Sequence, residues 1–228
     1  MDKRAAQVRL LNWIVFQENI GILGIQGSGK TTLCRQILDT IPNIPRLIIS
    51  PQKPREHYGR YGTPIDDISQ ITQGRAQYWV GDFSKQTMER IATAIMSRCY
   101  NMVLVIDDCQ EFCTKQKIYP SFNRLIQSGR NRGICNIFLS PSPNLVNNYI
   151  LQSCQHMFAF QMNLESQIEW IQKNLFGNDA WILLQKSRRK REPETVYYEG
   201  EILPPHSCLY KHYANTESEL FLGGVPIG

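Results

Sequence analysis

Apolar runs of strand length alternate along this chain with segments whose apolar residues recur every three or four positions. The apolar runs lie at 19–24, 46–50, 77–80, 102–106 and 134–139. The amphipathic segments, which indicate helices, lie at 31–40, from Ser84 onward and at about 119–129. Strands that alternate with helices in this way predict an α/β fold in which helices flank a mostly parallel central sheet.

Two of the predicted helices carry clear boundary signals. Pro42 and Pro45 end the first, because proline lacks an N–H group and clashes with a continuing helix. Ser84 is a good N-cap for the second, since its hydroxyl can accept a hydrogen bond from the first turn. The predicted buried face of that helix consists of Met88, Ile91, Ala92, Ile95 and Met96.

Other stretches of the chain are less regular. Residues 52–76 are polar and rich in Gly, Pro and Arg, which predicts a long loop or an excursion from the core. After residue 163 we expect a helix, an extended stretch and a strand or hairpin arm, at 164–175, 181–184 and 195–203. We expect a single domain over 1–228, with its core at about 18–163 and a C-terminal extension at 164–228.

The N-terminus and the composition favour an intracellular protein. The N-terminal apolar residues fit an amphipathic helix better than a signal peptide, since no small-residue cleavage site follows. They are Ala6, Leu10, Trp13, Ile14 and Val15. No run approaches the roughly 18 apolar residues of a membrane-spanning helix. The cysteines, seven in number, have no paired spacing, which favours reduced and buried thiols. His206, Cys208 and His212 lie close together, but without a second ligand pair we predict no zinc site there.

The stretch GIQGSGKTT, residues 24–32, matches the P-loop pattern GxxxxGK[ST] between an apolar run and a helix. Glycines let backbone N–H groups turn toward an anion, and the helix N-terminus favours phosphate. In this motif Lys30 reaches the β and γ phosphates and the Thr31 hydroxyl binds Mg²⁺, so we predict binding of ATP with Mg²⁺. The predicted nucleotide-binding residues are Gly24, Gln26, Gly27, Ser28, Gly29, Lys30, Thr31 and Thr32.

A pair of acidic residues follows the apolar run 102–106. Asp107 fits the Walker B role, in which a carboxylate at the end of a strand holds the Mg²⁺ beside the phosphates. Asp108 can polarise the attacking water as a general base, which favours hydrolysis over transfer to an acceptor. The alternative for Asp108 is a solvated turn residue or an N-cap.

A basic loop, SGRNRG at 128–133, lies between a predicted helix and the next strand. An arginine in such a loop can reach the γ-phosphate of a neighbouring subunit and stabilise the transition state. Arg130 and Arg132 are both candidates for this arginine finger, and the sequence does not separate them. The alternative is a basic loop that contacts water.

With these elements the chain resembles the FtsK–HerA group of ring-forming P-loop ATPases. It resembles more closely the small genome-packaging ATPases of tailless icosahedral viruses with an internal membrane. The resemblance covers about residues 18–160 and implies a P-loop NTPase fold of the RecA-like (ASCE) type. It is carried by GIQGSGKT (24–31), VLVIDDCQEF (103–112) and SGRNRGICNIFLSPSPNLVNNYI (128–150).

One segment departs from the pattern of this family. Its members usually place a glutamine just after the sensor strand, whereas this chain has Ser-Pro-Ser-Pro-Asn at 140–144. Ser140, Ser142 and Asn144 are the candidates for the polar contact that senses the γ-phosphate.

The resemblance implies a homo-oligomeric motor, commonly a ring, that moves double-stranded DNA into a preformed capsid. It implies a place in the host-cell cytoplasm or at a packaging vertex of the virion, with capsid or vertex proteins as further partners. A net charge of +5 is compatible with a polyanionic partner.

A dense basic cluster is the predicted DNA contact, because its charges would neutralise phosphates. The cluster consists of Lys186, Arg188, Arg189, Lys190 and Arg191. Its alternatives are a solvated basic turn and a localisation signal. Arg55, Arg60 and Arg75, in the polar segment 52–76, are weaker candidates for lining a pore.

Two other functions remain open at the level of the sequence. A nucleotide or small-molecule kinase would use the basic run at 186–191 as a lid that clamps phosphates. A non-translocating switch or assembly factor would change its oligomeric state with ATP and turn over little. The ATPase rate against protein concentration, with and without duplex DNA, discriminates among the three.

Overall fold

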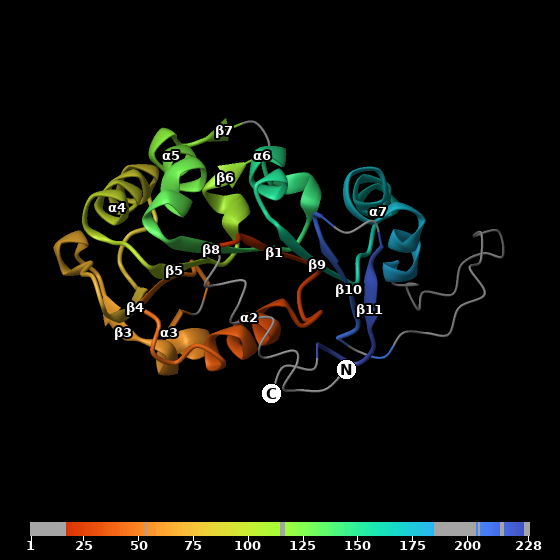
Figure 1. Ribbon diagram of the computed structural model, residues 1–228, viewed down its shortest axis with the longest axis horizontal. Helices are drawn as coiled ribbons and strands as arrows, with labels where there is room; N and C mark the ends of the chain where they lie inside the picture. The colour runs from red at the N-terminus through yellow and green to blue at the C-terminus, as the bar shows by residue number, and fades with distance from the viewer. Residues whose placement is uncertain are drawn as a thin grey trace.

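The structure is a computed structural model that describes residues 17–52, 54–114, 117–184, 204, 206–214 and 217–225. These residues form three layers, with a central sheet between two layers of helices (Figure 1). The described strands of the main sheet follow the order β11-β10-β9-β1-β8-β5-β2-β4-β3. The strands from β9 to β3 run parallel to their neighbours, while β10 and β11 are antiparallel.

The strands of the sheet are short, and the inner strands β9, β1, β8, β5 and β2 are fully buried. They are β1 (Ile20–Leu23), β2 (Arg46–Ile49), β3 (Thr63–Ile65), β4 (Ala76–Trp79), β5 (Met102–Ile106), β8 (Ile134–Ser140), β9 (His156–Phe160), β10 (Cys208–His212) and β11 (Glu219–Phe221). A separate hairpin pairs β6 (Cys113–Thr114) with β7 (Lys117–Ile118).

Helices cover both faces of the sheet (Figure 1). One face holds α2 (Lys30–Asp39) and α3 (Pro54–Tyr58), and the other holds α4 (Lys85–Arg98), α5 (Pro120–Ser128), α6 (Asn148–Gln152) and α7 (Glu165–Ile171). Strand β5 shows why the sequences of the inner strands are unbroken apolar runs: both faces of each strand are covered. Val103 and Val105 pack in the core on the α2 face, while Leu104 and Ile106 pack in the core on the α4 face.

The predicted α/β fold with a mostly parallel sheet is confirmed. The five predicted strands and the helices at 31–40 and 119–129 are present, each within one residue at either end. The predicted N-cap of α4 is also present, since the Ser84 hydroxyl accepts a hydrogen bond from the Thr87 N–H. Met96 is only partly buried in that helix.

Two predictions for the less regular stretches of the chain were wrong. The segment 52–76 is not a plain loop, because it contains α3, β3 and 3₁₀ turns. Four buried residues attach it to the core, namely Tyr58, Tyr61, Ile65 and Ile71. The segment 181–184 is not extended, since Gly177–Leu183 forms a 3₁₀ helix and only Leu184 makes a bridge, to Met162.

The C-terminal part of the chain contributes to the main sheet. The helix predicted at 164–175 begins at Glu165 as α7 and continues as a π-helix over Gln172–Phe176. Strands β9, β10 and β11 were not predicted, and β10 pairs with β9 along its whole length. The helix predicted near the N-terminus and the strand predicted at 195–203 lie outside the described residues.

All seven cysteines are buried and none forms a disulfide. In the described part of the chain, no helix has both the length and the apolar character needed to cross a membrane.

Candidate nucleotide site

Parallel pairing brings the P-loop and the acidic pair to one edge of the sheet. Gly24 follows β1, and its N–H donates to the Ser140 carbonyl at the end of β8, at 3.2 Å. Asp107 follows β5, and its N–H donates to the Ile49 carbonyl at the end of β2, at 2.9 Å. This carboxyl edge is where open α/β sheets bind their ligands.

The P-loop has a conformation that requires glycine. A Cβ at Gly24 would lie 2.6 Å from the Cβ of Phe160 and 2.6 Å from the Ser28 hydroxyl, too close for any side chain. Gly29 has a φ of 116° and caps the N-terminus of α2 without a side-chain hydrogen bond. The N–H groups in the first turn of α2 have no intrahelical partner, so they are available to an anion.

Two buried polar side chains complete the cradle and fit a phosphate. The Ser28 hydroxyl is buried and has no hydrogen-bond partner among the described residues. The Lys30 ammonium donates to the Ile25 carbonyl within the loop, at 3.0 Å. Burial lowers the pKa of Lys30, while the charges of Asp107 and Asp108 oppose that shift. Of the other predicted residues, Gln26, Gly27 and Thr32 are exposed and Thr31 is half-buried.

Asp107 is buried and held from two sides. Its Oδ2 accepts from the Tyr58 hydroxyl at 2.8 Å, and its Oδ1 accepts from the Asp108 N–H at 3.0 Å. Burial raises the pKa of Asp107, and the hydrogen bond from Tyr58 and the charge of Lys30 act to lower it. Each carboxylate oxygen can accept more than one hydrogen bond or ligand, so a hard cation and its waters fit this donor set.

Asp108 lies in the left-handed region, with φ 53° and ψ 46°. This conformation is uncommon for residues other than glycine, and such strain is often found at functional sites. Its side chain is half-buried, and its Oδ1 accepts a hydrogen bond from the Gln110 amide at 3.3 Å. Asp108 precedes a 3₁₀ turn at Cys109–Glu111 but makes no side-chain capping bond there. The alternative role as a side-chain N-cap therefore finds no support.

Two residues at this edge were missed by the sequence reasoning. Tyr58 is fully buried in the segment that we predicted as a loop, and it contacts the acidic pair through Asp107. The His206 Nδ1 lies 3.2 Å from the Ser28 carbonyl of the P-loop, across 178 positions of sequence. No local pattern marks either residue, because both contacts depend on long-range packing.

The candidate sensor residues form a compact turn at the end of β8. The Ser140 hydroxyl donates to the Ser142 carbonyl at 3.0 Å, and the Ser142 hydroxyl accepts from the Asn144 N–H at 3.3 Å. The Asn144 amide donates to the Ser166 carbonyl, so it points toward α7. Ser140 is the candidate bonded through its backbone to the P-loop.

Arg130 and Arg132 lie at the opposite edge of the sheet from the P-loop. They belong to a 3₁₀ turn, Gly129–Arg132, that leads into the amino end of β8. The Arg132 side chain is half-buried, and its Nε donates to the Cys99 carbonyl at 3.0 Å, whereas Arg130 is exposed. Neither arginine is near the cradle of its own chain.

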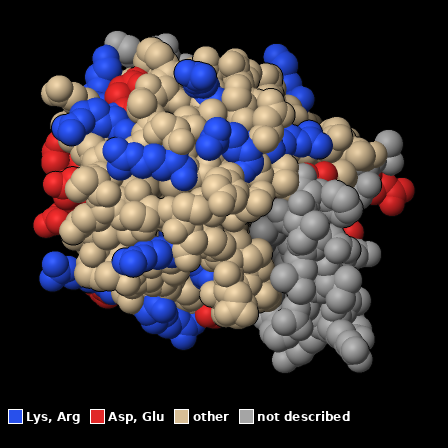
Figure 2. All heavy atoms as spheres, turned by 60° about the vertical axis from the view of Figure 1, so that its left-hand side comes forward, with Lys and Arg blue, Asp and Glu red and all other residues tan. Residues whose placement is uncertain are grey.

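The predicted DNA contacts divide into separate groups. The cluster at 186–191 lies outside the described residues. Arg55 and Arg60 line a groove of about 500 Å³ between α2 and α3, and Arg60 pairs with Asp39 at 2.8 Å. Arg75 lies at the amino end of β4, where its carbonyl accepts a hydrogen bond from the Arg46 N–H at 3.0 Å. On the face of the molecule at the β3 and β4 side, Lys and Arg side chains are separated by uncharged atoms (Figure 2).

Solved structures of viral packaging proteins and of a conjugation coupling protein have a fold similar to that of this chain. The genome packaging NTPase B204 from Sulfolobus turreted icosahedral virus 2, in complex with ATP-gammaS, superposes with a TM-score of 0.72 at 17% identity, over 92% of this chain and 98% of that one. B204, the DNA-packaging ATPase from Sulfolobus turreted icosahedral virus, gives 0.72 at 16% identity, over 92% and 99%. The pCW3 conjugation coupling protein TcpA, with ATPgS, gives 0.59 at 12% identity, over 93% and 64%.

No protein-family model matches this chain, and no curated protein matches it by sequence. The P-loop NTPase fold that the resemblance implied is confirmed. The edge of the sheet that carries GIQGSGKTT and the acidic pair is thus the ligand edge of a P-loop NTPase fold, and the chain has the fold of the viral genome-packaging ATPases.

Proposed function

We propose that this chain is a Mg²⁺-dependent ATPase that moves double-stranded DNA, with packaging of a viral genome into a preformed capsid as its task. One observation carries the proposal. Lys30, Asp107 and Asp108 meet at the sheet edge where the uncapped N-terminus of α2 offers its N–H groups. The likeness of the fold to the B204 packaging proteins supports the choice of task.

Each residue of the site has a distinct role in this proposal. Residues 24–32 hold the phosphates through backbone N–H groups and through Lys30. Thr31 and Asp107 hold the Mg²⁺, which supplies positive charge against the phosphates when it is bound. Asp108 accepts a proton from the attacking water, and Ser140 is the sensor candidate closest in bonding to the P-loop.

The motor is a homo-oligomeric ring in this proposal. Because Arg130 lies at the edge opposite the cradle, it reaches a γ-phosphate only in a neighbouring copy, and the same holds for Arg132. The basic cluster at 186–191 contacts DNA phosphates, and the ring works in the host-cell cytoplasm against a capsid vertex.

The ATPase rate, measured against protein concentration with and without duplex DNA over a range of salt, tests the proposal. We expect the rate to rise with both oligomerisation and DNA. Lys30→Ala and Asp108→Asn should each lower turnover by roughly 10²–10⁴-fold, as expected for loss of a phosphate-binding or general-base group. The exposed Lys173→Ala and Asp66→Asn serve as matched controls and should behave like the wild type.

Other outcomes of this experiment would select another function. Equal rates with and without DNA at every salt concentration contradict translocation. Transfer of the γ-phosphate to an acceptor instead of to water indicates a kinase. A change of oligomeric state with ATP and little turnover indicates a switch. In such a switch the turn at 140–144 would not link the state of the γ-phosphate to movement.

A further inference from the structure

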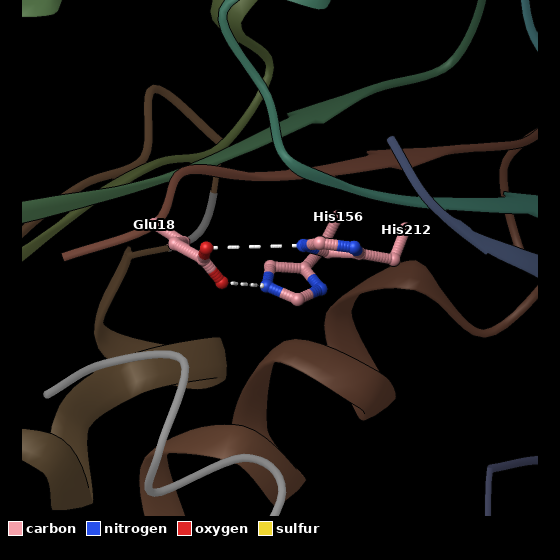
Figure 3. A group of neighbouring side chains, drawn as sticks. All are labelled: Glu18, His156 and His212. Carbon is pink, nitrogen blue, oxygen red and sulfur yellow. Dashed lines mark hydrogen bonds and ion pairs between the residues drawn. The ribbon is translucent and has the colours of Figure 1, made fainter. Parts of the chain in front are cut away.

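A group of metal-ligating side chains lies away from the nucleotide site, at the amino edge of the parallel sheet. Glu18 precedes β1, His156 begins β9 and His212 ends the antiparallel β10. These three strands are direct neighbours, and His156 and His212 stand opposite each other in the β9–β10 pair. Figure 3 shows the Glu18 carboxylate facing both imidazole rings.

The ligand atoms of this group are close enough to share one cation. All of them lie within 4.8 Å of one another. The Glu18 Oε2 lies 2.7 Å from the His156 Nε2, and the Oε1 lies 3.8 Å from the His212 Nε2. Ligands bound tetrahedrally at about 2.0–2.1 Å are separated by roughly 3.4 Å, so the two Glu18–histidine separations must each change by less than about 1 Å and the His156–His212 separation by at most about 1.4 Å.

We propose that Glu18, His156 and His212 form a binding site for a divalent transition-metal cation, with Zn²⁺ as the preferred ion. Two imidazoles and one carboxylate are a donor set that suits zinc, and a set of three protein ligands leaves a fourth position for water. The Glu18 and His212 side chains are 20% and 23% exposed, so the site is open to solvent on one side.

The surroundings of the group fit metal ligation. The His156 Nδ1 lies 3.0 Å from the Tyr210 hydroxyl, the kind of outer partner that orients a metal-bound imidazole. When His156 binds the cation through Nε2, its ring proton is on Nδ1, facing the Tyr210 hydroxyl, and the contact between Nε2 and Glu18 gives way to the bonds of both groups to the cation.

Metal binding also has a local cost. The His212 Nδ1 accepts a long hydrogen bond from the Ala214 N–H, at 3.4 Å. A ring that binds metal through Nε2 carries its proton on Nδ1, so this bond is lost. The bond is at the long end of the range for N–H donors, and we expect coordination to outweigh it.

The bound ion would fasten the C-terminal strand β10 to the central part of the sheet. It joins segments that lie 56 positions apart, His156 and His212, and it joins both of them to the segment that precedes β1. The inference is independent of the proposed ATPase function, since the group lies at the other end of these strands from the P-loop.

Zinc binding to the tag-free chain, stripped with a chelator and measured by titration calorimetry and metal analysis without nucleotide, tests the inference. We expect one equivalent of Zn²⁺, and tetrahedral absorption when Co²⁺ replaces it. Glu18→Gln keeps a hydrogen-bond acceptor for His156 but is a poor ligand, so affinity should fall roughly tenfold or more. His212→Ala, at a partly exposed position, should do the same.

Two control variants locate the ion. His57→Ala, on α3, removes a histidine outside the group, and Asp107→Asn removes the carboxylate of the nucleotide site. Both should keep one equivalent of Zn²⁺ at wild-type affinity. A wild-type chain without Zn²⁺ affinity in the micromolar range or tighter would overturn the inference. So would equal affinity in wild type, Glu18→Gln and His212→Ala, each shown to be folded by circular dichroism.

Discussion

At the scale of single residues, the carboxylates at the end of β5 are shaped by neighbours that come from other parts of the chain. Asp107 is buried, which opposes its ionisation, while Tyr58 and Lys30 favour the charged form. The charged form is the one that can hold a cation. Tyr58 is therefore a positioning residue, since it acts on the proposed Mg²⁺ site through Asp107 and not by direct contact with the phosphates.

Tyr58→Phe removes the hydroxyl but keeps the buried ring. We expect turnover to fall roughly 10-fold and the Mg²⁺ concentration for half-maximal rate to rise, as seen when outer partners of metal ligands are removed. Stability should fall by only about 1 kcal/mol, the usual net value of one hydrogen bond. ATPase rates measured over a series of Mg²⁺ concentrations check this prediction.

Tyr61→Phe is the matched control, because the Tyr61 hydroxyl contacts Arg60 and the Arg35 carbonyl but not Asp107. Its Mg²⁺ dependence should equal that of the wild type. If both variants shift the Mg²⁺ dependence equally, Tyr58 has no special link to the metal site.

The residues that could be predicted from the sequence are those whose chemistry is encoded locally. The positions of Lys30 and Asp107 follow from a short motif and from the end of an apolar run. Tyr58, His206 and the pair His156–His212 could not be predicted, because each meets its partner across a large sequence separation. Their roles arise from strand order, which periodicity does not give.

At the scale of elements, α4 shows how local signals set a helix boundary. The Ser84 hydroxyl accepts from the Thr87 N–H at 3.3 Å, and Asp82 in turn accepts from the Thr87 hydroxyl at 2.7 Å. The helix then buries Met88, Ile91 and Ile95 against the sheet. The cap and the apolar face agree, so the sequence was sufficient to predict where this helix begins and most of its buried face.

Ser84→Ala removes the cap of α4. We expect the free energy of unfolding to fall by about 1 kcal/mol, which corresponds to about 2–4 °C in Tm for a chain of this size. Ser97→Ala on the same helix is the control, since Ser97 lies in the last turn and bonds only to the Ala94 carbonyl there. Chemical and thermal denaturation measure both. Equal losses in the two variants would mean that the cap has no specific effect.

The elements that were missed have different physical causes. Helix α3 spans only Pro54–Tyr58, too short for a 3.6-residue period to show. Strands β10 and β11 become strands by pairing with β9, and β9 itself begins with a histidine. The stretch 181–184 is apolar enough for a strand, but it packs in a 3₁₀ turn beside α7.

At the scale of the whole molecule, the proposed catalytic groups lie at opposite ends of the strands. The cradle is at the carboxyl edge, and the arginine loop is at the amino edge of β8. Arg132 bonds to the Cys99 carbonyl within its own chain, while Arg130 is exposed, so Arg130 is the better candidate for the finger.

Arg130→Ala should lower turnover by roughly 10³-fold or more without loss of folding, because an arginine finger contributes that much to rate. Arg132→Ala should mainly lower stability, since its Nε bond joins the loop to Cys99. Mixing Arg130→Ala with Asp108→Asn protein should restore part of the activity, because mixed oligomers contain intact shared sites. ATPase assays of the mixture and of each variant alone check this.

Arg124→Ala, exposed on α5, is the control for loss of a surface charge and should keep wild-type turnover. A mixture that gains no activity over its inactive components would contradict a finger that acts between subunits.

The separation of cradle and arginine loop also bears on how copies could be arranged. A contact between the amino edge of one copy and the carboxyl edge of the next joins unlike surfaces, so it has no twofold axis. Where the rotation between copies closes into a ring, successive copies point the same way around it, and every copy is both donor and recipient. An assembly of this kind has a direction built into it, so hydrolysis could pass from copy to copy in one rotational sense.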